Sequence, residues 1–278
     1  MSGSFAARAV PVVAALLLCS PLMNAQGNGQ AAKAATEPAS APAPRHDISG
    51  LWFPAGFAVG DRGASNMPED GKPEHQLPYT AAALEKMKKM YPGNGTREAP
   101  ATKINDPAVI YCDPQGMPRQ DLYELRATQI MQTPAKVFVL YQMGRIWRYI
   151  WQDGREVPKD PDPKWFGTSV GKWEDDYTFV ATTVGVDDRT WLDKGGRPLS
   201  EDIVVEERFH RLSADRMQFT VTVNDPKMYT KPWVALNVPM RLLPDNSDVP
   251  EMMCSVSEFM QYNEKMGWGN PTALYGGK

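Results

Sequence analysis

One carboxylate of the sequence, Glu207, falls where an apolar side chain is expected. The stretch Ile203–Leu212 alternates between two faces, and Glu207 shares its face with Val205 and other apolar residues. A carboxylate in such surroundings either holds a proton or pairs with a cation, because an isolated buried charge is costly. Glu207 is therefore a candidate general acid or base. Alternatively, an inward-facing arginine, such as Arg148 or Arg211, pairs with it and stabilises the fold.

The loop Val184–Asp202 gathers a second set of candidate site residues. It connects two predicted strands and is longer than the ~2–5 residues usual in a hairpin. Long loops on β scaffolds often carry function. We predict that the loop caps one mouth of a barrel and that Trp191 contacts a ligand or closes the entrance. Asp188, Arg189 and Asp193 would orient polar groups. The alternative is a loop that pairs with itself through these three charged residues.

Aromatic side chains recur at every second residue of the stretch Arg145–Trp151. Trp147, Tyr149 and Trp151 alternate there with Arg148 and two isoleucines. This alternation is typical of a β-strand with two different faces. We predict that the aromatic face lines a hollow inside the fold, where Trp147, Tyr149 and Arg148 would contact a small ligand.

Gly167–Gly171 matches the G-x-S-x-G pattern of serine hydrolases, with Ser169 at the nucleophile position. That chemistry needs the serine on a tight turn from a strand into a helix. Here Lys172 and the residues after it continue as a predicted strand, although Asp188 and His210 follow in the order of a catalytic triad. We therefore interpret the match as a turn.

Two cysteines, Cys112 and Cys254, remain after the N-terminal segment. In an oxidising compartment, such an isolated pair forms a disulfide more often than a reactive site. We predict a bond between them. The alternative is two separately buried thiols.

The first 25 residues have the pattern of a secretory signal peptide, with a basic start, an apolar run and Ala25 at the predicted cleavage site. Cys19 offers the alternative of a lipoprotein, although Leu18 before it is bulkier than is usual there. Residues 26–46 are rich in Ala, Pro, Gly and Gln and predict a disordered tether. Residues 47–278 would form one β-rich domain, periplasmic or secreted.

The overall charge argues against a nucleic-acid partner. The chain has 30 basic and 33 acidic residues, and no basic stripe. No apolar run after the N-terminus approaches the ~18 residues of a membrane-spanning helix. The 3 histidines stand at no ligand spacing, and the sequence has no phosphate-binding or dinucleotide-binding motif. We therefore expect neither a metal nor a cofactor. The oligomeric state stays open.

Alternating patterns from Thr128 onward predict a mostly β fold. Short polar turns separate these stretches, which favours an antiparallel meander. A meander of about eight strands closes economically into a lipocalin-like barrel, closed or partly open, because closure removes exposed edges. A sandwich is the alternative. Short helices are expected at Thr80–Tyr91 and Ser257–Met266. The predicted strands are Ala127–Gln132, Lys136–Tyr141, Arg145–Trp151, Ser169–Glu174, Tyr177–Val184, Ile203–Leu212, Met217–Val223 and Trp233–Leu243.

Two resemblances add to this picture. Gly50-Leu51-Trp52 resembles the G-x-W signature of lipocalins, in which the tryptophan closes one end of a barrel able to hold a small ligand. The strings "GKWE", "DRTWLD", "ERF", "DPKMYTKPW" and "YCDPQGMPR" together resemble a large family of uncharacterised secreted bacterial proteins. That resemblance covers roughly Asp47 to Cys254 and implies a β-rich fold without assigning an activity.

The second resemblance also implies where the family's recurring residues lie. They correspond here to the run Asp188–Asp193, the pair Glu207 and Arg208, and the segment Asp225–Trp233. This chain departs from the pattern at positions where members carry histidine. Thr168, Arg197 and Leu199 stand there, and His210 replaces the usual arginine. Chemistry that depends on those histidines would be absent from this chain.

Three functions remain compatible with the sequence. The first is binding of a small, partly apolar and aromatic molecule in a barrel pocket. The second is a lyase, isomerase or hydrolase that uses Glu207 with Asp188 or Asp193 as acid and base. The third is an envelope interaction module without a ligand pocket. A pocket of ~300–1,000 Å³ would favour the first two, and a filled barrel the third.

Overall fold

The computed structural model describes residues 40–55, 76–93, 95, 97–122 and 125–265. The predicted signal peptide and most of the predicted tether lie outside this range. The last residues of the predicted tether contact the barrel. The amide of His46 donates to the carbonyl of Asp176 at 2.7 Å, and the amide of Ala214 donates to the carbonyl of Ala41 at 2.8 Å. The ring of His46 lies 5.0 Å from that of Trp173.

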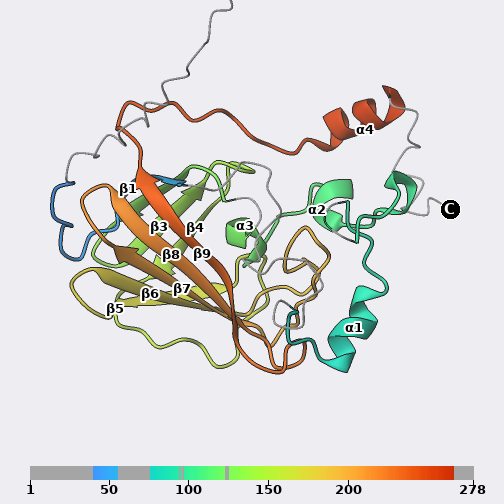
Figure 1. Cartoon of the computed structure of the whole chain (residues 1–278), viewed down its shortest axis with the longest axis horizontal. Helices are drawn as coiled ribbons and strands as arrows, with labels where there is room; N and C mark the ends of the chain where they lie inside the picture. The colour runs from blue at the N-terminus through green and yellow to red at the C-terminus, as the bar shows by residue number, and fades with distance from the viewer. Residues whose placement is uncertain (1–39, 56–75, 94, 96, 123–124, 266–278) are drawn as a thin grey trace, which may run out of the picture. The chain divides into compact units, whose positions relative to one another are not determined.

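Nine strands form a closed barrel in which every strand is paired with its neighbours in the sequence and β1 closes on β9 (Figure 1). The prediction of a mostly β fold with a closed barrel is confirmed, and the alternative sandwich is wrong. Strand bounds lie within about two residues of the predicted ones. The strands are β1 Gly50–Pro54, β2 Thr128–Gln132, β3 Lys136–Tyr141, β4 Trp147–Trp151, β5 Thr168–Trp173, β6 Thr178–Val184, β7 Val204–Arg211, β8 Arg216–Asn224 and β9 Trp233–Leu242.

One pair of neighbouring strands, β4 and β5, is parallel. Strand directions cannot alternate all the way around a closed ring with an odd number of members, so a nine-stranded barrel must contain a parallel pair. The prediction of an antiparallel meander is therefore wrong at this position. A parallel pair needs a long crossover, which residues 152–167 supply. The pairing is short, with only Ile150 opposite Ser169 and Trp151 opposite Val170.

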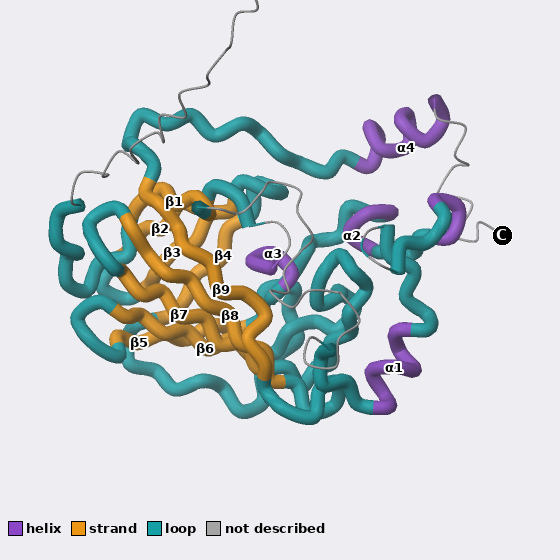
Figure 2. Tube along the Cα trace, in the orientation of Figure 1, coloured by secondary structure: helices purple, strands orange, loops and turns teal. Residues whose placement is uncertain are grey.

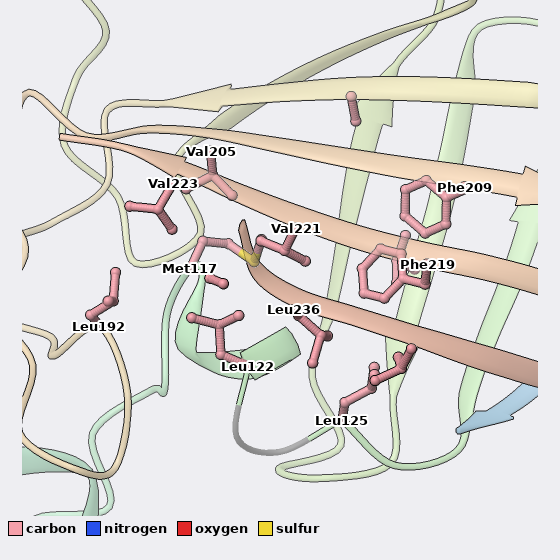
Figure 3. Packing of buried hydrophobic residues seen from close by; sticks show 14 of the residues in the cluster. Met117, Leu122, Leu125, Leu192, Val205, Phe209, Phe219, Val221, Val223 and Leu236 are labelled. Atoms are coloured by element: carbon pink, nitrogen blue, oxygen red, sulfur yellow. The ribbon is translucent and has the colours of Figure 1, made fainter. Parts of the chain in front are cut away.

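The inside of the barrel is packed with side chains. Inward-facing residues alternate with outward-facing ones along β7 and β8. The rings of Phe209 and Phe219 lie 4.7 Å apart, and the rings of Phe179 and Phe209 lie 6.4 Å apart. Figure 3 shows this packing, with Met117 and Leu122 close to the valines of β7 and β8. The prediction of an aromatic-walled hollow inside the barrel is therefore wrong, because side chains pack that space.

Strand β4 turns its aromatic face outward, contrary to the prediction. Arg148 and Ile150 are buried, whereas Trp147 is 58% exposed and Tyr149 is 36% exposed. Aromatic rings and a long polar arginine occupy the two faces of one strand. The arginine faces inward because buried carboxyl and hydroxyl groups receive it there.

Few helices accompany the strands, as Figure 2 shows. The helices expected near residues 80–91 and 257–266 are confirmed, whereas α2 and α3 were not predicted. In the part of the chain that the structure describes, none of the helices could cross a membrane. Their bounds are α1 Ala81–Met87, η2 Ala101–Lys103, α2 Pro107–Ile110, α3 Arg119–Leu122 and α4 Val256–Lys265.

The predicted disulfide between Cys112 and Cys254 is formed, with the two Cα atoms 5.5 Å apart. The segment before Cys254 is also tied to the turn after β3. The amide of Gly144 donates to the carbonyl of Met252 at 2.7 Å, and the side chain of Gln142 donates to the carbonyl of Pro250 at 2.9 Å. The disulfide therefore closes a 142-residue loop that contains most of the barrel.

Candidate functional site

A cavity of about 330 Å³ lies where β4 and β5 separate. We call it the seam pocket. It begins beside the pair Ile150 and Ser169, where the ladder between the two strands ends, and extends toward the first residues of both strands. Its walls are mainly aromatic because the outward face of β4 borders it on one side and the segment before β5 on the other. The aromatic lining residues are Trp147, Tyr149, Trp151, Trp165 and Phe166.

The wall opposite β4 is held in place by backbone hydrogen bonds. The amide of Lys164 donates to the carbonyl of Gly185 at 2.9 Å, and the amide of Asp187 donates to the carbonyl of Lys164 at 2.9 Å. The amide of Met117 donates to the carbonyl of Trp165 at 3.0 Å. These bonds join the crossover to two other loops, so the pocket wall is a fixed part of the fold.

Cations surround the aromatic rings at the rim. The guanidinium carbon of Arg155 lies 3.4 Å from the ring centre of Trp151, and the ammonium of Lys136 lies 4.2 Å from the same centre. Arg189 lies 4.8 Å from the ring centre of Trp165. Such contacts hold ring and cation together through the negative face of the ring. They fix these rings, and two of the cations are themselves paired, Arg155 with Asp153 and Arg189 with Asp187.

The polar floor of the pocket is formed by Arg148 and Ser169. Arg148 is buried, and three of its side-chain groups have partners. Its Nε donates to the hydroxyl of Tyr141 at 2.8 Å, and its Nη1 donates to Ser169 Oγ at 3.1 Å. Its Nη2 donates to Oε1 of Glu207. Ser169 Oγ also bonds Thr183 Oγ1 at 2.8 Å. The interpretation of Glu207 as the partner of an inward arginine is therefore confirmed.

A second carboxyl group, on Asp121 of α3, lies behind Arg148. Its Oδ2 is 3.8 Å from Nη2 of Arg148. Burial raises the pKa of Asp121 well above its usual value, and the negative charge of Glu207 raises it further, whereas Arg148 and a hydrogen bond from Tyr141 oppose the shift. Sequence reasoning missed Asp121 because four-residue helices show no periodicity. No local pattern marked it, since the sequence shows only three consecutive polar residues, from Arg119 on, before the apolar Leu122.

The loop carboxylates predicted to work with Glu207 have other partners. Asp193 is buried and forms an ion pair with Arg197. Asp188 is exposed and lies 3.4 Å from the ammonium of Lys86. Among the contacts of the described residues, none joins either carboxylate to Glu207. The structure therefore gathers the predicted residues Arg148 and Glu207 with Asp121, and leaves the loop acids elsewhere.

The loop itself is largely built into the core. Leu192 and Leu199 are fully buried in the same cluster as the barrel interior, and Trp191 is also buried. Arg189 is exposed and pairs with Asp187 at 2.5 Å. The loop does pair with itself through two of the three predicted residues, since Arg189 pairs with Asp187 and Asp193 with Arg197, whereas Asp188 contacts Lys86 outside the loop. Trp191 is not part of the seam pocket lining.

The serine-hydrolase pattern does not form its elbow. Ser169 lies within strand β5, and its hydroxyl bonds Arg148 and Thr183. The Nδ1 of His210 instead lies 2.8 Å from Thr178 Oγ1. In the described ranges, no group of three or more His, Cys, Asp or Glu residues is arranged to hold a metal ion.

Two other cavities differ from the seam pocket in the residues that line them. One of about 500 Å³ lies between the crossover and the start of β7, beside Lys159 and Glu201. One of about 230 Å³ lies between Phe53 and Met252 and is almost entirely apolar. The seam pocket combines a wall of aromatic rings with a buried cation, which is the combination expected of a specific small-molecule site.

The resemblance to a secreted bacterial family stays a prediction. Comparison with known proteins supplies no relative whose function could be transferred to the seam pocket. No family model, no curated protein and no solved structure matches this chain.

Proposed function

We propose that the protein binds a small, partly apolar molecule with an aromatic part in the seam pocket. The observation that carries this proposal is the juxtaposition of five aromatic rings with the buried Arg148 around one cavity. A volume of about 330 Å³ lies at the lower end of the range for ligand pockets, which favours a small ligand.

The geometry accounts for both parts of such a ligand. Trp147 is exposed at the entrance and offers a flat apolar surface, whose burial by a ligand ring would be favourable. Arg148, Ser169 and Thr168 offer hydrogen-bonding groups deeper in the pocket. A few polar groups in an aromatic cavity orient a ligand, while the rings supply most of the contact area.

The two other functions have weaker support. An acid–base enzyme that uses Glu207 with Asp188 or Asp193 needs these carboxylates in one site, and each pairs with a different cation. An interaction module would use the exposed rings of β4 alone and would not need a buried arginine at their base. Our proposal also places the protein in the periplasm or outside the cell, because disulfides persist in oxidising compartments.

Replacement of Trp147 by alanine tests the proposal. Phenylnaphthylamine, a neutral aromatic dye that fluoresces in apolar surroundings, is the probe. We expect Trp147→Ala to weaken its binding about fivefold or more, because an aromatic anchor contributes above ~1 kcal/mol. Fluorescence titration measures the dissociation constant, and circular dichroism verifies that the variant folds.

Tyr91→Ala is the matched control, because Tyr91 is another exposed aromatic residue, 44% accessible, that does not line the pocket. We expect it to bind the dye like the unaltered protein. Absence of saturable binding, or equal losses in the two variants, would contradict the proposed function.

A further inference from the structure

We propose that the seam pocket selects ligands with an anionic group, which binds at Arg148, and that Asp121 admits the anion only while its carboxyl group carries a proton. This inference rests on the proposed function, since it specifies the ligand class and the control of the same pocket. It follows from the arrangement of one buried cation between a pocket and two carboxyl groups.

Arg148 has donors left for a ligand. A guanidinium carries five N–H groups. Within the described residues, Tyr141, Ser169 and Glu207 take one each. The remaining two belong to Nη1 and Nη2, the pair of nitrogens that matches the two oxygens of a carboxylate or sulfonate. Because Arg148 lines the pocket while its side chain is only 4% exposed, an anion would meet it in a largely dry site.

Two buried carboxyl oxygens behind Arg148 have no hydrogen-bond donor. They are Oε2 of Glu207 and Oδ2 of Asp121. Both carboxyl groups adjoin the same guanidinium nitrogen, Nη2 of Arg148. Two ionised carboxylates can only accept, so neither can satisfy the other unless one of them carries a proton. Asp121 is the carboxyl group whose proton is stabilised by burial and by the neighbouring negative charge.

The proton on Asp121 decides the charge that an incoming anion meets. With Asp121 protonated, Arg148 and Glu207 neutralise each other. With Asp121 ionised, two carboxylates face one guanidinium and the cluster is negative. A second anion placed against a negative buried cluster is repelled strongly, because the interior screens charge poorly. The pocket should therefore accept anions in the first state and reject them in the second.

Few other charges act on Asp121. The titratable or charged groups that affect it are Arg148 on β4, Glu207 on β7 and Tyr141 on β3. Arg119, on the same helix, is held by Asp106 in a buried two-bond pair. Lys164 also lines the pocket; it is exposed and adds a positive charge that favours anions. Asp121 is thus the group whose titration changes the charge of the floor.

The experiment compares two dyes with the same ring system. Anilinonaphthalene sulfonate carries a sulfonate that stays ionised, and phenylnaphthylamine lacks it. Titrations between about pH 5 and about pH 9 should show sulfonate affinity falling as pH rises through the raised pKa of Asp121, by up to about tenfold per pH unit for one linked proton. Phenylnaphthylamine affinity should stay constant over the same range.

Asp121→Asn separates this inference from a general effect of pH. The asparagine amide can donate a hydrogen bond, as a protonated carboxyl group can, but it cannot ionise. We expect the variant to bind the sulfonate dye as tightly as the unaltered protein does at the acidic end, without pH dependence. Calorimetry of the unaltered protein in two buffers adds an independent readout, namely proton uptake with the sulfonate dye and none with phenylnaphthylamine.

The outcomes distinguish the two proposals. Saturable phenylnaphthylamine binding together with a sulfonate affinity that is flat with pH, or with no proton uptake, would overturn the inference and leave the proposed function standing. The inference is also wrong if Asp121→Asn keeps the pH dependence. Failure of both dyes to bind would overturn the proposed function itself.

Discussion

Replacing Arg148 by methionine is expected to lower the free energy of unfolding by about 3–5 kcal/mol. The substitution removes the cation that pairs with Glu207 and leaves a carboxylate with 0% exposure without compensation. It also removes the donors that Tyr141 and Ser169 use. Urea unfolding followed by circular dichroism measures the change.

Two further variants identify the cause. Arg208→Met breaks the ion pair with Glu174 on the outside of the barrel and should cost less than ~1 kcal/mol, because partly exposed pairs contribute little. The double variant Arg148→Met with Glu207→Met also removes the carboxylate that has lost its cation. This double variant should therefore be more stable than Arg148→Met alone. If Arg148→Met costs no more than Arg208→Met, the account of a desolvated cluster is wrong.

Removal of the disulfide is expected to have a similarly large effect. The bond closes a loop of 142 residues, and restriction of the unfolded chain by such a loop contributes about 4–5 kcal/mol in the chain-entropy estimate. The variant with Cys112→Ser and Cys254→Ser should unfold at a correspondingly lower urea concentration. The native protein treated with a reductant should match it.

The single variants provide the internal control. Either Cys112→Ser or Cys254→Ser breaks the same bond, so each alone should cost as much as both together. Cys254 is exposed, so the exchange of sulfur for oxygen there contributes little by itself. An unfolding midpoint that does not change on reduction would show that the bond does not stabilise this fold.

The barrel could be predicted because its strands alternate clearly. In β8, apolar residues occupy every second position, and β7 keeps the same alternation except at Glu207 and Arg211; each boundary falls at a polar turn. The direction of β5 could not be predicted, because it depends on the number of strands in the closed ring and not on local pattern. Recognition of Gly50–Pro54 as a ninth strand would have indicated that one pair must be parallel.

The site was predictable only in part. The apolar neighbours of Glu207 indicated a buried carboxylate, and Arg148 was one of its two candidate partners. The face that each residue of β4 presents could not be read from the sequence, since either alternate set looked suitable for the interior. A residue distant in sequence determines which face of β4 points inward, because Glu207 accepts a hydrogen bond from Arg148 inside the barrel.

Asp121 shows a different limit. Its helix is too short for a periodic pattern, and its environment is made by residues from β3, β4 and β7. The charged residues of the loop Val184–Asp202 suggested a site, yet the leucines of this loop are packed into the hydrophobic core. Charged residues close in sequence therefore indicated a site less well than a single carboxylate on an apolar face.

A crystal structure of the protein with phenylnaphthylamine tests the central claim most directly. The account predicts the dye in the seam pocket, in contact with the rings of Trp147 and Trp165 and above Arg148, with the chain otherwise unchanged. Dye bound instead in the apolar cavity beside Phe53 and Met252, with the seam pocket unaltered, would contradict it.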